Sequence, residues 1–396
     1  MNLPKLKQVL TDPDEFISNR QLKALSLELL LLIPMPGIEG SPLDPGDIME
    51  VVLRAAAGTT SVNGVTTNTE ETPNREPVMD WLHTLEKDPM LDAVNNILAT
   101  LAMTVLDRHR SRTVCIDFMD NPFHGTPSSD GETRRMSARD GTTQCHRYCT
   151  AFVIAKGKPL TLAVEPVAGE DSKADAVERL LARVETYPFE IDRILMDRDA
   201  YVGKLIGVLR ESAPPVFPVK TGKASIRKKL SVTASYMTEE TICEGKEHEQ
   251  TFPMAVNVTY QNGDRGKSGV KATGYAAYGL EDRTPAQVAT IYNKRSQIEK
   301  SYEKFREARA VTTTPSTTIR LFYVSVGFLL EQLWLVLQWA VLARPRRGGR
   351  ALPVEFTFGD AFLHGVVREL DRGLGWKEKH RTNGTGLPAG CDHGLG

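Results

Sequence analysis

Residues 191–219 read IDRILMDRDAYVGKLIGVLRESAPPVFPV and contain a strand, a helix and a second strand in close succession. The apolar run at 191–196 predicts a short strand that ends at Asp197. Residues 201–211 place apolar side chains at helical spacing, and residues 216–219 form the second apolar run. This alternation of strand and helix is typical of an α/β sheet that is covered by helices.

Three further strands and one helix are expected upstream of this stretch. The strands are residues 113–116, which end at Asp117, 148–155 and 160–164, and the helix is residues 171–187. Residues 120–143 are rich in glycine, proline, serine and aspartate, which favours a loop. The order of three strands, helix, strand, helix and strand predicts a mixed five-stranded sheet with flanking helices.

Residues 220–280 interrupt this order with a predicted β-rich insertion. Residues 251–260 and 269–278 have strand character around Asn262-Gly263, which is a common hairpin turn. The segment at 263–268 resembles a phosphate-binding loop, but Gln261 stands where that motif requires glycine. We therefore expect a basic hairpin tip here rather than a nucleotide site.

A long helix is predicted after the insertion. Thr284 can cap its start together with Gln287, and Pro285 suits the first helical position. No breaker follows until the threonine run before Pro315, so we expect one continuous helix. An apolar stripe on one side of this helix would face the core; it consists of Ile291, Ile298, Tyr302 and Phe305.

The same helix carries a second, charged stripe. Tyr292, Arg295, Glu299 and Arg306 fall at roughly 0°, 300°, 340° and 320° around a helix that turns about 100° per residue. A carboxylate between two arginines suits a site that handles metal and phosphate. A solvated charged face is the ordinary alternative for a helix rich in lysine and glutamate, so the stripe needs support from other residues.

Such support comes from two aspartates that follow predicted strands. Asp117 and Asp197 are held by the sheet, and Glu299 can be brought to them by the helix. Carboxylates are the ligands that magnesium prefers, and paired divalent ions activate hydroxyl groups at phosphodiesters. The alternatives that remain open for these three positions are Asp120, Asp199 and Glu303.

The first 108 residues are expected to be helical. Three short helices, near residues 48–56, 61–71 and 74–85, are separated by tight polar turns. They resemble a helix-turn-helix arrangement, which would place the third helix in a DNA groove. A plain helical bundle explains the pattern equally well.

The composition bounds the remaining possibilities. The chain has 396 residues, of which 41% are hydrophobic and 25% charged, and a formal net charge of −1. It therefore exerts no bulk attraction on polyanions, and nucleic acid would have to bind at local basic patches. Five cysteines in a chain of this length favour a reducing, intracellular compartment over a disulfide scaffold. Cys145, His146 and Cys149 lack the second cysteine pair of a zinc site.

One apolar segment has the length of a membrane span. Residues 321–343 are almost continuously apolar, but Glu331, Gln332 and Gln338 interrupt them. Because a carboxylate at the centre of a bilayer is costly, we expect a buried core helix and no membrane contact.

Several motifs together resemble the DDE transposases of the insertion-sequence-four group, and especially their archaeal members. The helix motif of that family is Y-x2-R-x3-E-x6-K, which Tyr292, Arg295 and Glu299 match, with Arg306 in place of the lysine. The stretch at 194–198 resembles the region of the family's second aspartate. Residues 115–117 and 140–143 resemble its first-aspartate region, and the likeness covers about residues 110–340.

The resemblance implies a ribonuclease-H-like core with Asp117, Asp197 and Glu299 as catalytic and metal-binding residues. It implies two Mg²⁺ ions, replaceable by Mn²⁺, that cut DNA at the terminal inverted repeats of a transposon. The freed 3′-hydroxyl would then attack target DNA. Tyr292, Arg295 and Arg306 would contact DNA phosphates, and we add Lys300 from the same basic stretch. A homodimer in a prokaryotic cytoplasm, associated with the nucleoid, is the expected setting.

The domain organisation follows from these assignments. We expect a helical N-terminal domain at 1–108, a catalytic core at 109–343 and a C-terminal extension at 344–396, whose glycine-rich end from residue 374 would be mobile. Two other functions remain open: another ribonuclease-H-like nuclease such as a resolvase, and a non-catalytic DNA-binding regulator. A resolvase would not need the Tyr292/Arg295 motif, and a regulator would not need the aspartates.

Overall fold

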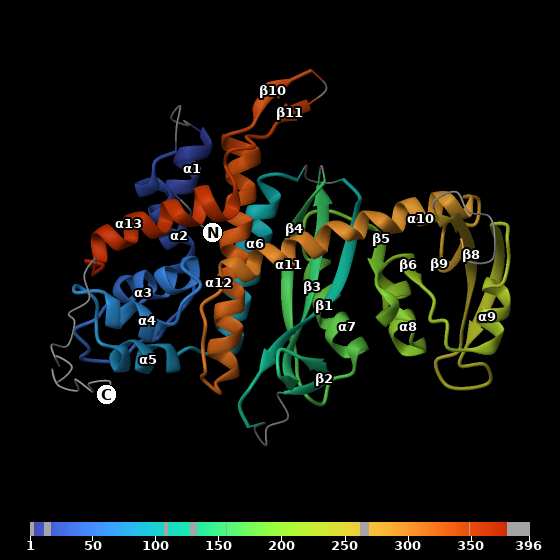
Figure 1. Ribbon diagram of the computed structural model, residues 1–396, viewed down its shortest axis with the longest axis horizontal. Helices are drawn as coiled ribbons and strands as arrows, with labels where there is room; N and C mark the ends of the chain where they lie inside the picture. Colours follow the sequence, from blue (N-terminus) through green and yellow to red (C-terminus); the bar gives the residue numbers. More distant parts are fainter. Residues whose placement is uncertain are drawn as a thin grey trace, which may run out of the picture.

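A mixed β-sheet forms the centre of the molecule, and helices from both ends of the chain gather beside it (Figure 1). The computed structural model describes residues 4–11, 17–106, 110–126, 133–155, 157–261, 269–347 and 349–377. The predicted mobile tail is wrong for residues 374–377, because Leu374 is buried and Trp376 forms a β-bridge with Thr69. The rest of that tail, the Asn262-Gly263 turn and the segment that resembles a phosphate-binding loop lie outside the described residues. The strand order is β2-β3-β1-β5-β6-β9-β8-β7, with β4 on the free part of the β3 edge.

The five strands that the sequence predicts for the core are present. They are β1 (Arg112–Phe123), β3 (Thr142–Ala155), β4 (Lys158–Val167), β5 (Ile191–Met196) and β6 (Pro215–Pro218). β3 pairs antiparallel with both β1 and β4. β5 pairs parallel with β1, and β6 pairs parallel with β5. The helices α7 (Lys173–Val184) and α8 (Gly203–Ser212) make the crossovers. The mixed α/β architecture is therefore confirmed.

The predicted loop at 120–143 is wrong. β1 continues past Asp117 to Phe123, because its residues keep pairing with β3 after the shorter β5 has ended. A further strand, β2 (Arg134–Arg139), pairs with the start of β3. Asp140 and Gly141 make the turn between them with φ of 51° and 80°, a left-handed conformation that glycine and aspartate tolerate.

Three strands of the 220–280 segment extend the core sheet. These are β7 (Tyr236–Ile242), β8 (Gln250–Tyr260) and β9 (Val270–Ala277), preceded by the short helix α9 (Ala224–Leu230). β9 pairs antiparallel with β6, and β8 and β7 follow in order. The sequence indicates β8 and β9 but not β7.

Helices cover both faces of the core strands. Side chains alternate between the faces of a strand, so neighbouring residues of β1 report on opposite sides. Asp117 contacts Arg295 in the segment between α10 (Pro285–Asn293) and α11 (Gln297–Glu307). The next residue, Phe118, lies under the ammonium group of Lys173 at the start of α7. The α10–α11 segment and α7 therefore cover opposite faces, and α10 and α11 cross the strands in Figure 1.

The apolar segment predicted as a core helix is α12 (Thr317–Val336), which continues as a π-helical turn through Leu337–Val341. It is the one helix among the described residues that is long and apolar enough to cross a membrane, and its apolar window is entirely buried. Its polar residues have partners inside the protein. Ser301 donates a hydrogen bond of 2.7 Å to Glu331, and the backbone of Thr161 donates one of 3.0 Å to Gln332.

Glu331 makes the stability of the protein depend on pH. Burial raises the pKa of its carboxyl from 4.5 to about 8. Between these values the folded protein holds one proton more than the unfolded chain, so the free energy of unfolding falls as the pH rises. Glu331→Gln keeps an acceptor for Ser301 and is expected to flatten this decline. Thermal melting of both proteins from pH 5 to 9 checks this, and an unchanged pH dependence would contradict it.

The N-terminal helices are α1 (Pro4–Thr11), α2 (Asn19–Leu30), α3 (Pro45–Ala57), α4 (Val62–Asn68), α5 (Arg75–His83) and α6 (Lys87–Met103). The C-terminal helix α13 (His364–Leu374), which follows a π-helical turn at Phe358–Leu363, packs on α2 and α3. Arg54 of α3 forms an ion pair of 2.5 Å with Asp371 and lies 4.1 Å from the ring centroid of Trp376. The two ends of the chain thus share one helical layer (Figure 1).

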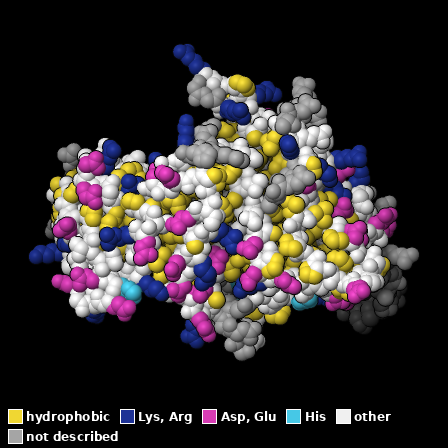
Figure 2. Space-filling model, turned by 180° about the vertical axis from the view of Figure 1, so that it is seen from behind, with side chains coloured by type: hydrophobic (Ala, Val, Ile, Leu, Met, Phe, Trp, Pro, Cys, Tyr) yellow, Lys and Arg dark blue, Asp and Glu magenta, His cyan; other side chains and the backbone are white. Residues whose placement is uncertain are grey.

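A two-stranded hairpin projects from the body of the molecule. Its strands are β10 (Arg344–Arg346) and β11 (Gly349–Ala351), and they lie beyond α12 in Figure 1. Figure 2 shows the projection from the opposite side, with basic side chains on it. The exposed arginines include Arg344, Arg346 and Arg347.

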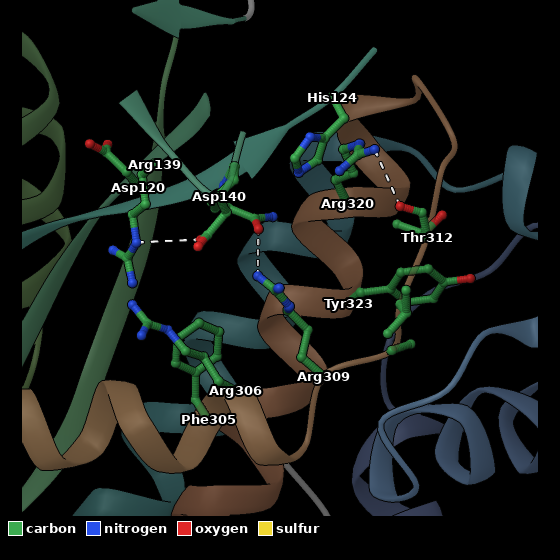
Figure 3. A pocket seen from close by; sticks show the side chains of 14 residues that line it. Asp120, His124, Arg139, Asp140, Phe305, Arg306, Arg309, Thr312, Arg320 and Tyr323 are labelled. Atoms are coloured by element: carbon green, nitrogen blue, oxygen red, sulfur yellow. Dashed lines mark hydrogen bonds and ion pairs between the residues drawn. The ribbon is translucent and has the colours of Figure 1, made fainter. Parts of the chain in front are cut away.

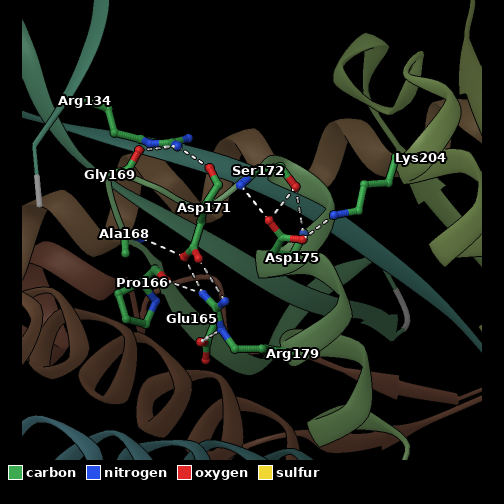
Figure 4. Close-up of polar contacts among 10 residues, drawn as sticks. All are labelled: Arg134, Glu165, Pro166, Ala168, Gly169, Asp171, Ser172, Asp175, Arg179 and Lys204. Atoms are coloured by element: carbon green, nitrogen blue, oxygen red, sulfur yellow. Dashed lines mark hydrogen bonds and ion pairs between the residues drawn. The ribbon is translucent and has the colours of Figure 1, made fainter. Parts of the chain in front are cut away.

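A polar network holds α7 and α8 in place beside the sheet (Figure 4). Arg179 of α7 donates hydrogen bonds of 2.7 Å to Glu165 and 2.6 Å to Asp171. Lys204 at the start of α8 forms an ion pair of 2.6 Å with Asp175 at the start of α7. Because α7 precedes β5 and α8 follows it, these contacts fix the helices that flank the loop after Met196.

Candidate active site

Asp117 and Asp197 lie side by side, Asp117 in β1 and Asp197 directly after the neighbouring strand β5. Ile116 of β1 pairs with Met196 of β5, so the two following residues are at the same level of the sheet. Asp197 comes directly after β5, as predicted. Asp117, however, does not end its strand but lies within β1, at the point where pairing with β5 stops. The sheet therefore places the two aspartates together.

Asp117 is held in a buried ion pair. Its Oδ1 accepts a hydrogen bond from Arg295 at 2.7 Å and another from the backbone of Phe118 at 3.0 Å. The side chains of Asp117 and Arg295 are only 12% and 11% exposed. Burial raises the pKa of Asp117 to about 6; the charge of Arg295 opposes this rise and the charge of Asp197 adds to it.

The two neighbouring aspartates do not belong to this pair. Asp120 forms two hydrogen bonds with Arg147, at 2.6 and 2.8 Å. Asp199 pairs with Lys173 at the start of α7, and its backbone donates a hydrogen bond to Asp197. Asp120 and Asp199 are thus each bound to a cation of their own, as Asp117 is bound to Arg295, and Asp197 has no ion pair among the described residues.

Tyr292 and Arg295 complete the surroundings of the aspartates. The ring of Tyr292 packs 5.2 Å from that of Tyr275, and burial raises the pKa of Tyr292 to about 12. Burial lowers the pKa of Arg295, but the charges of Asp117 and Asp197 oppose this and the net shift is upward. The Nε of Arg295 is buried and has no hydrogen-bond partner among the described residues.

The predicted continuous helix is interrupted at this site. α10 ends at Asn293, a 3₁₀ turn spans Lys294–Ser296, and α11 begins at Gln297. Arg295 lies in the turn, where it enters the ion pair with Asp117. A 3₁₀ turn rotates each residue by about 120° rather than 100°, so the side chains after it leave the predicted stripe. The predicted capping box of Thr284 and Gln287 is present.

Glu299 is not in contact with the aspartates. It lies one turn beyond Arg295 on α11, and its side chain is exposed. Within the part of the chain that the structure describes, no three histidine, cysteine or acidic side chains are grouped to hold a metal ion. The structure thus brings together Tyr292, Arg295, Asp117 and Asp197, while Glu299 stays at the edge.

Lys300 and Arg306 belong to other surroundings. The charge of Lys300 acts on Lys158 and Lys304, whose pKa values are lowered by burial and then by neighbouring lysines. Lys304 itself lies 3.9 Å from the centroid of the Trp334 ring. Arg306 is exposed near the end of α11, where it lines a separate cavity. The four motif residues are therefore spread along the helices rather than grouped at one point.

The aspartate pair suits a divalent cation. Two adjacent carboxylates, one of which has its pKa raised by burial and by the other's charge, gain from a nearby positive charge. Oxygen ligands from Asp117 and Asp197 meet the preference of Mg²⁺, which keeps several water ligands. Glu299 is on the adjoining helix and would have to turn its side chain inward to join them. The donor set therefore fits Mg²⁺.

Sequence reasoning missed Thr150 and the hydroxyl group of Tyr302, which are linked by hydrogen bonds to the backbone of Asp117. The hydroxyl groups of Tyr302 and Thr150 are 2.6 Å apart, and Thr150 donates a hydrogen bond of 3.2 Å to the carbonyl of Asp117. The predicted place of Tyr302 in the apolar stripe is confirmed, since Tyr302 is only 9% exposed. Its hydroxyl carries no sequence signal of this second role.

A basic cavity lies at the far end of α11, and sequence reasoning missed it as well (Figure 3). Its volume is about 330 Å³. Four arginines and one histidine line it together with two aspartates; these are Arg139, Arg306, Arg309, Arg320, His124, Asp120 and Asp140. Arg309 lies in the basic stretch of the predicted helix and Arg320 near the start of the apolar one, and these were the available signals.

Similarity to known proteins is found at the level of the structure and not of the sequence. Neither known protein families nor curated protein sequences give a match. Among solved structures, a piggyBac transposase determined as a synaptic complex with hairpin DNA aligns with 96% of this chain and 83% of its own, at a TM-score of 0.50. The two chains share a fold. With 11% identity the similarity extends to the fold alone, a mixed α/β fold built on a large mixed sheet.

Proposed function

We propose that this protein is a DDE-type DNA transposase that cuts DNA at transposon ends and joins the freed 3′-hydroxyl to target DNA. The observation that supports this most is the side-by-side placement of Asp117 and Asp197 on β1 and β5. The shared fold with a transposase supports it at a coarser level. The motif of Tyr292, Arg295 and Glu299 favours the insertion-sequence-four group within this class.

Asp117, Asp197 and Glu299 would hold the Mg²⁺ ions, for which Mn²⁺ can substitute. Such ions activate a water or hydroxyl for attack on a phosphodiester and stabilise the leaving oxygen. Arg295 neutralises Asp117 in the absence of metal, and its buried Nε would need a shift of the side chain to reach a phosphate oxygen. The phenol of Tyr292 stays protonated at neutral pH, because its pKa is about 12, and can donate a hydrogen bond to DNA.

The proposed partners are DNA molecules and a second copy of the chain. The related piggyBac structure is a synaptic complex with hairpin DNA, which motivates pairing of two transposon ends by a homodimer here. Arg306 would contact a DNA phosphate, as would Lys300 on the other side of α11. The setting would be the prokaryotic cytoplasm, in association with the nucleoid.

Glu299 provides a sharp test of the third metal ligand. Glu299→Ala is expected to lower Mg²⁺-dependent cleavage by at least about a hundredfold, because a catalytic carboxylate is lost. Glu303→Ala is the matched comparison, since Glu303 is also exposed and is the alternative carboxylate one turn further along α11. A loss in Glu303→Ala alone would transfer the role to Glu303. Cleavage of end-labelled DNA on a denaturing gel measures both. Equal activity of the two variants would remove Glu299 from the site.

The product of the reaction distinguishes the proposed function from its alternatives. The substrate is DNA that flanks the coding region, supplied with Mg²⁺ and a target plasmid. A transposase joins the cut 3′-ends to the plasmid, whereas a resolvase cuts branched DNA without joining. A regulator binds the DNA and leaves it intact. Binding without cleavage under Mg²⁺ and Mn²⁺ would overturn the proposed enzyme.

A further inference from the structure

The basic cavity at the far end of α11 contains a buried arginine, Arg320, and a half-buried one, Arg309, and neither has an acidic partner among the described residues. Arg309, just beyond α11, donates a hydrogen bond to Asn121 of β1. Arg320 of α12 donates hydrogen bonds of 2.6 and 3.4 Å to the carbonyls of Thr314 and Thr312. Among the described residues neither guanidinium has a carboxylate within ion-pair distance.

Two other arginines with little exposed surface, Arg54 and Arg295, do have carboxylate partners. Arg54 pairs with Asp371, and Arg295 pairs with Asp117. Charged side chains are rarely buried without a partner, because their desolvation is costly. Arg320 is nevertheless only 6% exposed. A site that buries such a cation without a protein carboxylate is suited to an anion from outside.

The acidic residues of the cavity do not cancel its charge. Asp120 is already bound to Arg147 on both of its oxygens. Asp140 lies 3.5 Å from Arg139, and both of these side chains are exposed. The positive charge of Arg306, Arg309 and Arg320 is thus left for a ligand, and Figure 3 shows the labelled arginines around the hollow.

The cavity continues into a second one. Val311, Thr312 and Tyr323 line both, and the second has a volume of about 670 Å³. The second cavity reaches the N-terminal helices, where it is lined by Asn63 near the start of α4 and by Arg75 and His83 of α5. The two cavities together form a path from the end of α11 to α4 and α5.

We propose that Arg309 and Arg320 form a binding site for a backbone phosphate of a DNA strand, which continues along the second cavity toward α4 and α5. The inference rests on the proposed function, which supplies DNA as the ligand. Arginine offers a planar fork of N–H donors that matches the oxygens of a phosphate. The threonine-rich wall at 311–315 is neutral and polar, as suits a sugar–phosphate backbone.

The test measures binding of a mixed-sequence DNA duplex as a function of salt. Arg309→Gln is expected to lower the affinity roughly tenfold at low salt, because a charge-assisted contact is lost. It should also reduce the slope of log K against log salt by about 0.9, the value for one phosphate. Arg309→Lys should keep the slope. Arg372→Gln, an exposed arginine on α13, should behave as the wild type.

A second variant tests the site independently in case Arg309→Gln does not fold. Val311 is 53% exposed and lines both cavities, so Val311→Glu adds a negative charge without disturbing the core. It is expected to lower DNA affinity several-fold, whereas Val311→Gln should not. Folded Arg309→Gln and Val311→Glu proteins that bind DNA with the affinity and salt slope of the wild type would overturn the site.

Inorganic phosphate separates a DNA phosphate from a free one. If phosphate raises the melting temperature of the wild type but not of Arg309→Gln, while DNA binding is equal in both, the site serves a free anion and the proposal is wrong. Failure of the site is distinct from failure of the proposed function. If the wild type cuts DNA and Arg309→Gln binds DNA as the wild type does, only the proposed phosphate site is wrong. If the variants change binding as expected but the wild type does not cut DNA, only the proposed transposase function is wrong.

Discussion

Replacing Asp197 by alanine is expected to lower the rate of DNA-end cleavage by at least about a thousandfold, since a metal-binding carboxylate at a two-metal site is lost. DNA binding should not weaken, because Asp197 is negatively charged and its removal takes away repulsion of the phosphates. The fold should also persist. Removing Asp197 removes a charge that raises the pKa of Asp117, so the ion pair of Asp117 with Arg295 is kept.

The measurement uses cleavage rates and binding curves on the same DNA. Asp192→Ala is the matched control, because Asp192 is an exposed aspartate at the start of the same strand, β5. It should cut at the rate of the wild type. Undiminished cleavage by Asp197→Ala would sink the catalytic assignment, and equal losses in both variants would trace the effect to the strand rather than to the carboxylate.

Phe328→Ala is expected to lower the free energy of unfolding by about 3–5 kcal/mol, the usual range when a buried phenylalanine is truncated. Phe328 of α12 is fully buried and stacks on Phe305 of α11, with ring centroids 4.7 Å apart. It also meets Phe152 of β3 and Tyr302 of α11 edge-on. The truncation leaves a cavity between the sheet and the two helices that carry the site.

Urea denaturation followed by circular dichroism measures this loss. Val354→Ala is the control, since Val354 is 89% exposed and its truncation should cost less than about 0.5 kcal/mol. Because Tyr302 supports Thr150 under Asp117, Phe328→Ala should also slow cleavage at temperatures where the protein is still folded. A loss of stability below about 1 kcal/mol would show that α11 and α12 do not depend on this aromatic contact.

The sequence predicts the elements whose signals are local. The apolar run before Asp197 defines β5, and Thr284 with Gln287 defines the start of α10. The pairing of β1 with β5 then places Asp117 beside Asp197. The sequence predicts that both aspartates end a strand, which is correct for Asp197 but not for Asp117. The polar residues within α12 predict a buried core helix, and the helix is buried in the protein. Glu331 and Gln332 have hydrogen-bond partners there.

The remaining features depend on contacts between distant residues. β1 continues through Pro122 because β3 is there to pair with it, and no pattern in residues 118–123 indicates this. The 3₁₀ turn at Lys294–Ser296 contains no glycine or proline, and it coincides with the ion pair of Arg295 and Asp117. The cavity around Arg320 combines residues from β1, α11 and α12, so one-dimensional spacing gives no sign of it.

The packing of α13 on α2 and α3 has a consequence for synthesis of the protein. The ribosome releases the N-terminal helices hundreds of residues before His364–Leu374 leaves the exit tunnel. Until then Arg54 lacks Asp371, and the apolar side chains of α2 and α3 that α13 covers remain open to water. The helical layer is therefore completed only after the strands of the core have been translated, and a nascent chain that is stalled in those strands would expose this apolar surface to chaperones.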